Sequence, residues 1–228
     1  MQRANAIEWL TPPMRPCGDA RVSALVAALD DQHLIVDCAL LPTREDIVDR
    51  ARPGATGRDY FQKRRSLLRA FVAAQAGRNP DSIVVAYDPD GAPRIVQPDL
   101  PLYISTAGRG NLAAVCLGDA PVGIDLEIVD DSMTPLDHVL HPFESAVLRT
   151  LSGPLRARRF LQIWTMKEAY LKACRTGFRR DPCGIAILEP GGGELRIEDD
   201  GRAVPCLAQW RAHDINGCHV LAACVVLG

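Results

Sequence analysis

The sequence predicts an α+β fold made of two similar lobes in one chain. Three observations support this prediction. An amphipathic helix and a run of strands fill the first half, and Gly118-Asp119-Ala120-Pro121 indicates a break. After this break the same kinds of elements return, with helices and strands again combined. The likeness lies in the order of the elements alone, and we expect an N-terminal lobe over 1–119 and a C-terminal lobe over 120–228.

The elements of the first half follow from apolar periodicity and turn residues. Residues 21–39 favour two strands, Val22–Ala28 and Leu34–Ala39, although a helix stays open as an alternative. Thr43 caps a further helix, which ends near residue 53. The clearest helix is Arg58–Gln75, with apolar residues near one face and basic residues mostly on the other. The strands expected after it are Ser82–Tyr87, Leu102–Thr106 and Leu112–Leu117.

The second half begins with an apolar strand and ends with strands separated by glycine turns. The first strand is Val122–Glu127, and two helices follow it near Glu144–Leu151 and Arg158–Cys174. Turns at residues 191–193 and 199–201 separate the later strands. Those strands are expected near Ile185–Leu188, Val204–Ala212 and His219–Leu227.

Composition excludes several classes of protein. The chain has 228 residues, is 47% hydrophobic and carries a net charge of −2, which argues against a general nucleic-acid or membrane binder. Its eight cysteines form no C-x-x-C pair, so a zinc or redox site is not expected. They fit small buried residues in a reducing compartment. Without a signal pattern or an apolar run of membrane-spanning length, a cytoplasmic protein is expected.

Two short segments carry the chemistry. In Val122-Gly123-Ile124-Asp125-Leu126-Glu127, strand alternation turns Asp125 and Glu127 to one face, and Ile124 and Leu126 to the core. Two carboxylates at this spacing can bind one hard cation, with water and substrate oxygens completing its shell. The alternative is a strand end with two solvated acids.

The second segment is Trp164-Thr165-Met166-Lys167-Glu168-Ala169-Tyr170-Leu171-Lys172, on a predicted helix. Glu168 and Lys172 are one turn apart and share a face, as do Trp164 and Glu168. Taken alone, Glu168 and Lys172 also fit an exposed helical ion pair.

Read together, the two segments resemble the 4′-phosphopantetheinyl transferases. The resemblance rests on an apolar-Gly-apolar-Asp-x-Glu strand and an aromatic-Thr-x-Lys-Glu-Ala-x-x-Lys helix, with Asp125 and Glu168 43 positions apart. Pro101-Leu102-Tyr103-Ile104-Ser105-Thr106 is similar to the segment before the family's metal strand, and Arg58–Arg69 resembles its basic N-terminal helix. The chain length suits the two-lobed class, the surfactin-synthetase-activating type, and this implies a pseudo-twofold fold.

The resemblance implies that the chain moves the 4′-phosphopantetheine arm of coenzyme A to a serine of an apo acyl or peptidyl carrier protein. The reaction would depend on Mg²⁺, with Mn²⁺ as an alternative, and release adenosine 3′,5′-bisphosphate. Two lobes in one chain imply a monomer, and no nucleic-acid or membrane partner is expected.

The resemblance also assigns roles to residues of this chain. Asp125, Glu127 and Glu168 would bind the metal, and Glu168 would take the serine proton directly or through a water. Lys172 and Lys167 would neutralise pyrophosphate oxygens. Glu168, Lys172 and Asp125 are thus the expected catalytic residues. The expected coenzyme A contacts are Arg58, Arg65, Ser105, Thr106, Lys167 and Lys172. A solvated helix face is the alternative for Arg58 and Arg65, and a plain strand-end serine is the alternative for Ser105.

Two departures favour an alternative function. Thr106 stands where many members of this class have His, and Ala92 stands where many have Lys. Each change removes a potential cation from the adenosine end of coenzyme A. The alternative is therefore a catalytically weak or inactive module that binds coenzyme A or a carrier protein. A chance match in an unrelated metal-dependent nucleotide enzyme is a third reading, which the paired motifs disfavour.

Overall fold

The computed structural model describes residues 8–10, 22–29, 55–191, 194–215 and 217–228. In this part the elements follow the order β1 (Glu8–Leu10), β2 (Val22–Ala28), α3 (Ala55–Ala76), β3 (Val84–Tyr87), β4 (Pro93–Gln97), β5 (Tyr103–Arg109), β6 (Leu112–Gly118), β7 (Val122–Ile128), α4 (Pro142–Arg149), α5 (Gly153–Ala173), β8 (Ile185–Gly191), β9 (Glu194–Asp199), β10 (Arg202–Ala203), β11 (Cys206–Ile215) and β12 (Cys218–Leu227). The expected strand at Leu34–Ala39 and the helix after Pro42 lie outside the described residues.

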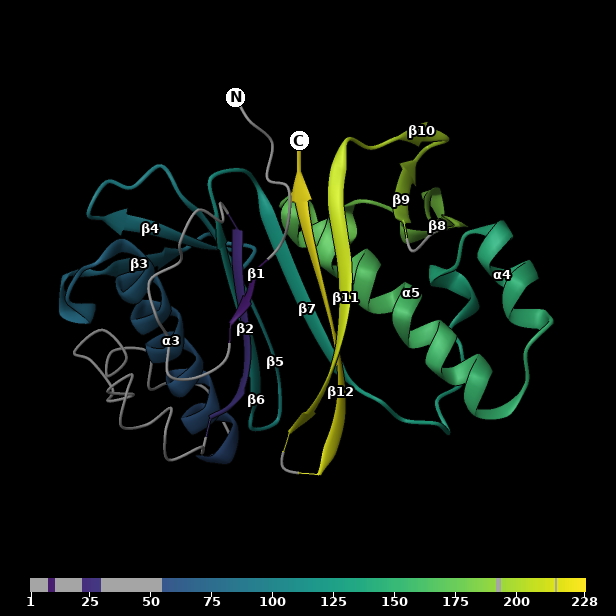
Figure 1. The fold of residues 1–228 in the computed structure, drawn as a ribbon, viewed down its shortest axis with the longest axis horizontal. Helices are drawn as coiled ribbons and strands as arrows, with labels where there is room; N and C mark the ends of the chain where they lie inside the picture. The colour runs from purple at the N-terminus through teal and green to yellow at the C-terminus, as the bar shows by residue number, and fades with distance from the viewer. Residues whose placement is uncertain (1–7, 11–21, 30–54, 192–193, 216) are drawn as a thin grey trace.

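The elements stack in four layers, helix–sheet–sheet–helix (Figure 1). Helix α3 covers a sheet of order β1-β2-β6-β5, and α5 covers a second sheet of order β11-β12-β7. A hairpin of β3 and β4 accompanies the first helix, and a smaller sheet of β10-β9-β8 accompanies the second. The predicted α+β fold of two similar lobes is confirmed. The division at residues 119 and 120 remains a prediction.

The two sheets face each other across an apolar core. Strand β2 turns Ala24 and Val26 into this core and Leu25 toward α3, so both of its faces are buried. On the far side of the core, Ile124 and Leu126 of β7 point inward, as alternation predicts. Because β7 contributes these residues to the core, its other face, with Gly123, Asp125 and Glu127, is turned toward α5.

Each helix adds a second apolar layer on the outside of its sheet. Leu67, Leu68 and Phe71 of α3 are completely buried against the first sheet. Phe160, Met166 and Ala169 of α5 are buried in the same way against the second. The clearest predicted helices therefore form, and their apolar faces hold them in place.

Strand β7 and helix α5 approach each other unusually closely at Gly123. A Cβ atom at this position would lie 1.9 Å from the carbonyl oxygen of Ala169 and 2.5 Å from the amide nitrogen of Ala173. Only a glycine leaves room for the helix backbone there. This contact fixes the height of α5 above the acidic face of β7.

The strand predictions differ from the structure in several places. Strands β4 and β9 were not predicted, and the expected strand at Ser82–Tyr87 begins only at Val84, after a 3-10 turn at Pro80–Ser82. The six cysteines in the described residues are all free thiols, with Cys116 and Cys224 buried. No helix in the described part of the chain has the length and apolar character needed to cross a membrane.

Candidate active site between β7 and α5

The two predicted segments meet face to face. Asp125 and Glu127 of β7 are 7% and 9% exposed, so neither is a solvated strand-end acid. Above them, Lys172 Nζ donates to Asp125 Oδ1 at 2.6 Å and to the carbonyl oxygen of Ile124 at 3.3 Å. Glu168, one turn earlier on the same helix face, is half-buried. The strand and the helix that the sequence singled out therefore lie against each other.

Burial raises the pKa of all three carboxyl groups above their ordinary values. For Asp125, burial is the main cause, and Lys172 opposes it. For Glu127, burial is again first, and the charge of Arg109 opposes it. For Glu168, the raised pKa comes from burial and then from the charges of Asp125 and Glu127. The three acids thus repel one another across one site, and a bound cation would relieve that repulsion.

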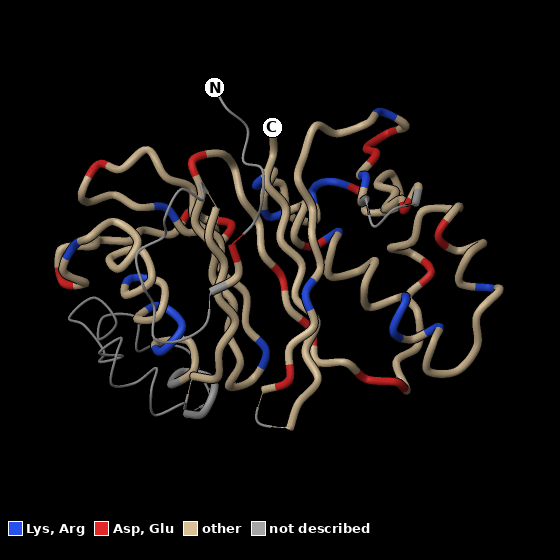
Figure 2. Tube along the Cα trace, viewed as in Figure 1, with Lys and Arg blue, Asp and Glu red and all other residues tan. Residues whose placement is uncertain are grey.

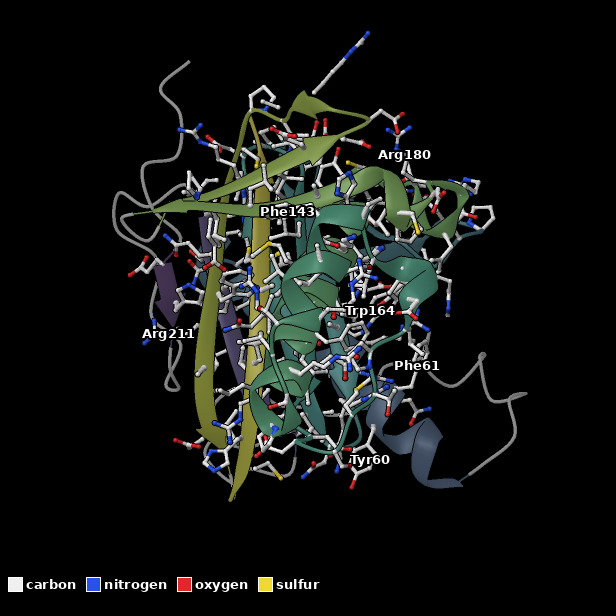
Figure 3. The ribbon with its side chains drawn as sticks, turned by 90° about the vertical axis from the view of Figure 1, so that its right-hand side faces the viewer. Tyr60, Phe61, Phe143, Trp164, Arg180 and Arg211 are labelled. Atoms are coloured by element: carbon white, nitrogen blue, oxygen red, sulfur yellow. The ribbon has the colours of Figure 1, made fainter. Side chains whose placement is uncertain are left out.

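Two further residues hold Glu127. Arg109, at the end of β5, pairs its Nε with Glu127 Oε2 at 3.1 Å. A side-chain hydrogen bond from Trp164 lowers the pKa of Glu127, and the Trp164 ring stacks on Phe178 with centroids 6.0 Å apart. Trp164 comes from α5, which lies on the side of the molecule that faces the viewer in Figure 3. The four-residue spacing of Trp164 and Glu168 predicted that they share a face, and Trp164 also packs against the core beneath α5.

The carboxylates fit a divalent cation, but they are not yet gathered around one. Among the described residues, no group of three or more His, Cys, Asp and Glu side chains stands in a metal-binding arrangement. Lys172 and Arg109 instead lie against Asp125 and Glu127. The second oxygen of Asp125, Oδ2, is buried and lacks a hydrogen-bond partner in this part of the chain. A buried oxygen of this kind is suited to a hard cation, and Mg²⁺ usually needs few protein carboxylates because waters and phosphates complete its shell.

The structure corrects the prediction for Lys167. Its side chain is completely buried, and Nζ pairs with Glu144 Oε2 at 2.6 Å. The same nitrogen donates to the carbonyl oxygens of Val139 at 2.8 Å and Pro182 at 2.9 Å. Neighbouring residues of a helix point about 100° apart, so Lys167 leaves the site on a different face from Glu168. It therefore joins α5 to α4, to the turn before α4 and to the loop after α5, and these contacts argue against a role in binding pyrophosphate.

We expect Lys167→Met to destabilise the fold by about 3–5 kcal/mol, because it leaves Glu144 charged and buried. Glu144 also accepts hydrogen bonds from the amides of His141 and Ile187, at 2.8 and 2.9 Å. Urea denaturation would measure the loss, and Lys167→Met with Glu144→Gln should cost less than the two single changes added together. If Lys167→Met has normal stability and loses only activity, Lys167 contacts the substrate and this prediction is wrong.

Ser105 has a structural partner within the protein. It is 4% exposed, and its hydroxyl oxygen accepts a hydrogen bond from the amide of Ile124 at 3.2 Å. This bond joins β5 to β7 where the two sheets meet. Thr106 is half-buried and donates its hydroxyl proton to the carbonyl oxygen of Ala114 at 3.1 Å. Ser105 thus links β5 to the acidic strand, and substrate contacts from Ser105 and Thr106 remain predictions.

The predicted basic helix forms as α3. Basic residues gather along α3 on the left of Figure 2. The Arg65 guanidinium lies over the Tyr87 ring, 4.7 Å from its centroid, and beside the Phe61 ring at 5.6 Å. The side chain of Arg58 lies outside the described residues. Arg65 is therefore held by aromatic rings at the edge of the β3–β4 hairpin, and a phosphate contact from it remains a prediction.

The part of the chain that contains this site resembles a family of known proteins. Residues 121–224 match the model of the 4′-phosphopantetheinyl transferase superfamily, and this range contains β7 and α5. The protein slr0495 of Synechocystis sp. is 32% identical over 51% of this chain and 50% of its own length. The 4′-phosphopantetheinyl transferase of Bacillus subtilis is 26% identical over 69% of this chain and 70% of its own length. HetI of Nostoc sp., a 4′-phosphopantetheinyl transferase, is 29% identical over 54% of each chain. The matches thus span about half the length of slr0495 and of HetI.

Proposed function

We propose that this chain, whose residues 121–224 match the model of the 4′-phosphopantetheinyl transferase superfamily, transfers the 4′-phosphopantetheine arm of coenzyme A to a serine of an apo acyl or peptidyl carrier protein. The observation that carries the proposal is the meeting of Asp125, Glu127, Glu168 and Lys172 between β7 and α5. All four side chains belong to the matched segment, and three acids with one lysine suit a pyrophosphate substrate and its metal ion.

The reaction joins the serine oxygen to the β-phosphorus of coenzyme A. The bond between that phosphorus and the bridging oxygen breaks, and adenosine 3′,5′-bisphosphate leaves with the oxygen. Glu168 receives the serine proton, directly or through a water, and its pKa, raised by burial, makes it a better proton acceptor than an ordinary carboxylate. Lys172 is 31% exposed and can turn from Asp125 toward the departing phosphate. Such a reaction depends mainly on positioning and on neutralising charge.

Asp125, Glu127 and Glu168 would hold the metal ion, Mg²⁺ or Mn²⁺. When bound, the ion would supply positive charge to the pyrophosphate oxygens and hold the substrate against the site. In its absence Lys172 and Arg109 neutralise Asp125 and Glu127. We propose that the metal ion takes over from these two side chains when it binds. The acids can then stay buried both before and after the substrate arrives.

The second substrate is a carrier protein, which we expect to approach with an acidic helix. Basic residues lie along α3 on the left of Figure 2, and Arg109 at the end of β5 brings a further positive charge to Glu127 in the site. Positive charge beside the site would steer the carrier toward it, so association should weaken as salt rises. Because one chain supplies both lobes, we propose that the enzyme acts as a monomer. We also propose that it works in the cytoplasm.

Removal of divalent metal is expected to stop the transfer. The purified chain would be incubated with coenzyme A and a panel of apo carriers, and the gain in carrier mass would be followed with and without a chelator. Transfer should stop on chelation and return on addition of Mg²⁺, with Mn²⁺ as a second test. Calorimetry gives an independent readout, because Mg²⁺ should bind wild type and bind more weakly to Asp125→Asn.

One result would reject the role of the metal, and another would reject the transfer itself. Transfer that continues unchanged after complete chelation would remove the metal from the reaction. Binding of coenzyme A without transfer to any carrier of a broad panel would favour the alternative, a module that binds coenzyme A and performs no chemistry.

A further inference from the structure

Helix α5 ends in an unusual backbone conformation. Cys174 caps the helix, and the next residue, Arg175, has a φ of 55°, in the left-handed region that favours glycine. The amide of Arg175 bonds to the carbonyl of Lys172 at 3.1 Å, and the amide of Thr176 bonds to that of Leu171 at 3.2 Å. A non-glycine residue persists in this conformation where its side chain or its surroundings give a reason.

The side chain of Arg175 reaches the other lobe. One terminal nitrogen lies 3.3 Å from Asp88 Oδ2, and the other donates to the carbonyl oxygen of Pro93 at 3.4 Å. Asp88 and Pro93 flank the tight turn of the β3–β4 hairpin, where the amide of Gly91 bonds to the carbonyl of Asp88. In Figure 1 the C-terminal end of α5 points toward this side of the molecule.

Other contacts hold the same turn from several directions. Arg94 Nε lies 3.3 Å from Asp88 Oδ1, and Arg179 lies 2.6 Å from Asp90. On the opposite side, the Arg65 guanidinium of α3 covers the ring of Tyr87. The turn is thus tied to α3 by Arg65 and to the end of α5 by Arg175 and Arg179. A single exposed ion pair contributes little to stability. Several ion pairs on one turn can contribute more, because a side chain that the backbone already positions loses less conformational entropy when the pair forms.

We infer that Arg175 is a positioning residue that holds the β3–β4 turn against the end of α5. It thereby fixes the first lobe relative to Lys172, which lies three residues earlier on the same helix. This inference rests on the proposed function where it concerns coenzyme A, which must lie between the two lobes to reach Lys172. The Arg175 guanidinium contacts Asp88 and Pro93, so among the described residues its side chain supports the site without touching the three acids.

Arg175→Gly tests the inference without a general loss of folding, since glycine fits a positive φ. Hydrogen exchange at the amides of residues 88–92 should become faster in this variant, while exchange in α5 stays unchanged. Asp88→Asn should speed exchange at least as much, because it also removes the pair with Arg94, and the double variant should add little to Asp88→Asn alone. Arg158→Ala is the matched control, because it removes an exposed ion pair with Asp131 far along α5 and should leave the turn unaffected.

The kinetic readout separates positioning from chemistry. We expect KM for coenzyme A to rise about three- to fivefold in Arg175→Gly, as loss of one such ion pair gives, with kcat little changed. Unchanged exchange at the turn together with an unchanged KM would overturn the inference. Equal losses in kcat and kcat/KM would also overturn it, because they would place Arg175 in the chemical step. If exchange changes as expected but wild type neither binds nor uses coenzyme A, the proposed function fails and the structural link stands.

Discussion

Glu168→Gln is expected to abolish transfer of phosphopantetheine while leaving the fold intact. The amide retains the size of the side chain but can neither accept the serine proton nor give a negative charge to the metal. Loss of a positioned proton acceptor alone costs about 10²- to 10⁴-fold in rate. Glu168 is also pushed toward its neutral form by burial and by Asp125 and Glu127, so removal of its charge should not destabilise the site.

The measurement is the initial rate of carrier modification, followed by mass spectrometry at saturating coenzyme A. Glu189→Gln is the matched control, because Glu189 is an exposed acid on β8 that pairs with Arg159 away from the site. It should keep the wild-type rate. Calorimetry should still detect binding of coenzyme A to Glu168→Gln. A rate within a few-fold of wild type would mean that another group accepts the proton.

Gly123→Ala adds only one methyl group, but we expect it to lower the free energy of unfolding more than any other such addition in the site. The added Cβ would lie 1.9 Å from the carbonyl oxygen of Ala169 and 3.0 Å from its carbonyl carbon, both backbone atoms that no rotamer change can move. Relief requires α5 to shift away from β7. Overpacking of this kind costs about 3 kcal/mol or more when the backbone must move. The shift would also pull Lys172 away from Asp125, so activity should fall together with stability.

Urea denaturation with linear extrapolation measures this effect. Gly118→Ala provides the comparison, because its new Cβ would meet side-chain atoms first, Val122 Cγ1 at 2.7 Å and Val22 Cγ2 at 3.2 Å. Side chains can adjust, so this variant should lose clearly less stability. A free energy of unfolding for Gly123→Ala within about 0.5 kcal/mol of wild type would contradict the close packing of β7 and α5.

The acidic strand and the charged helix could be predicted because each shows one clear period. Alternation sends Ile124 and Leu126 to the core, so Asp125 and Glu127 had to share the other face. The four-residue spacing put Glu168 and Lys172 together. Neither period shows that β7 and α5 pack on each other, and that contact was inferred only from the resemblance to the family.

Other features depend on contacts that no local pattern encodes. Lys167 is adjacent to Glu168, and only the position of α4 decides that its charge is buried against Glu144. Strand β2 is apolar on both faces because sheets and helix cover it from both sides, which is why its segment also fitted a helix. The link between Ser105 and Ile124 depends on the meeting of two sheet edges. Each of these is decided by tertiary packing.

The ratio of the two products gives the decisive measurement. Carrier modification and adenosine 3′,5′-bisphosphate would be quantified in the same reaction of wild type with coenzyme A, Mg²⁺ and an apo carrier. If the acids and Lys172 direct the serine to the β-phosphorus, one molecule of the bisphosphate should appear for each carrier serine modified. Coenzyme A cleaved without modification of the carrier would contradict this role of the site and would indicate a hydrolase.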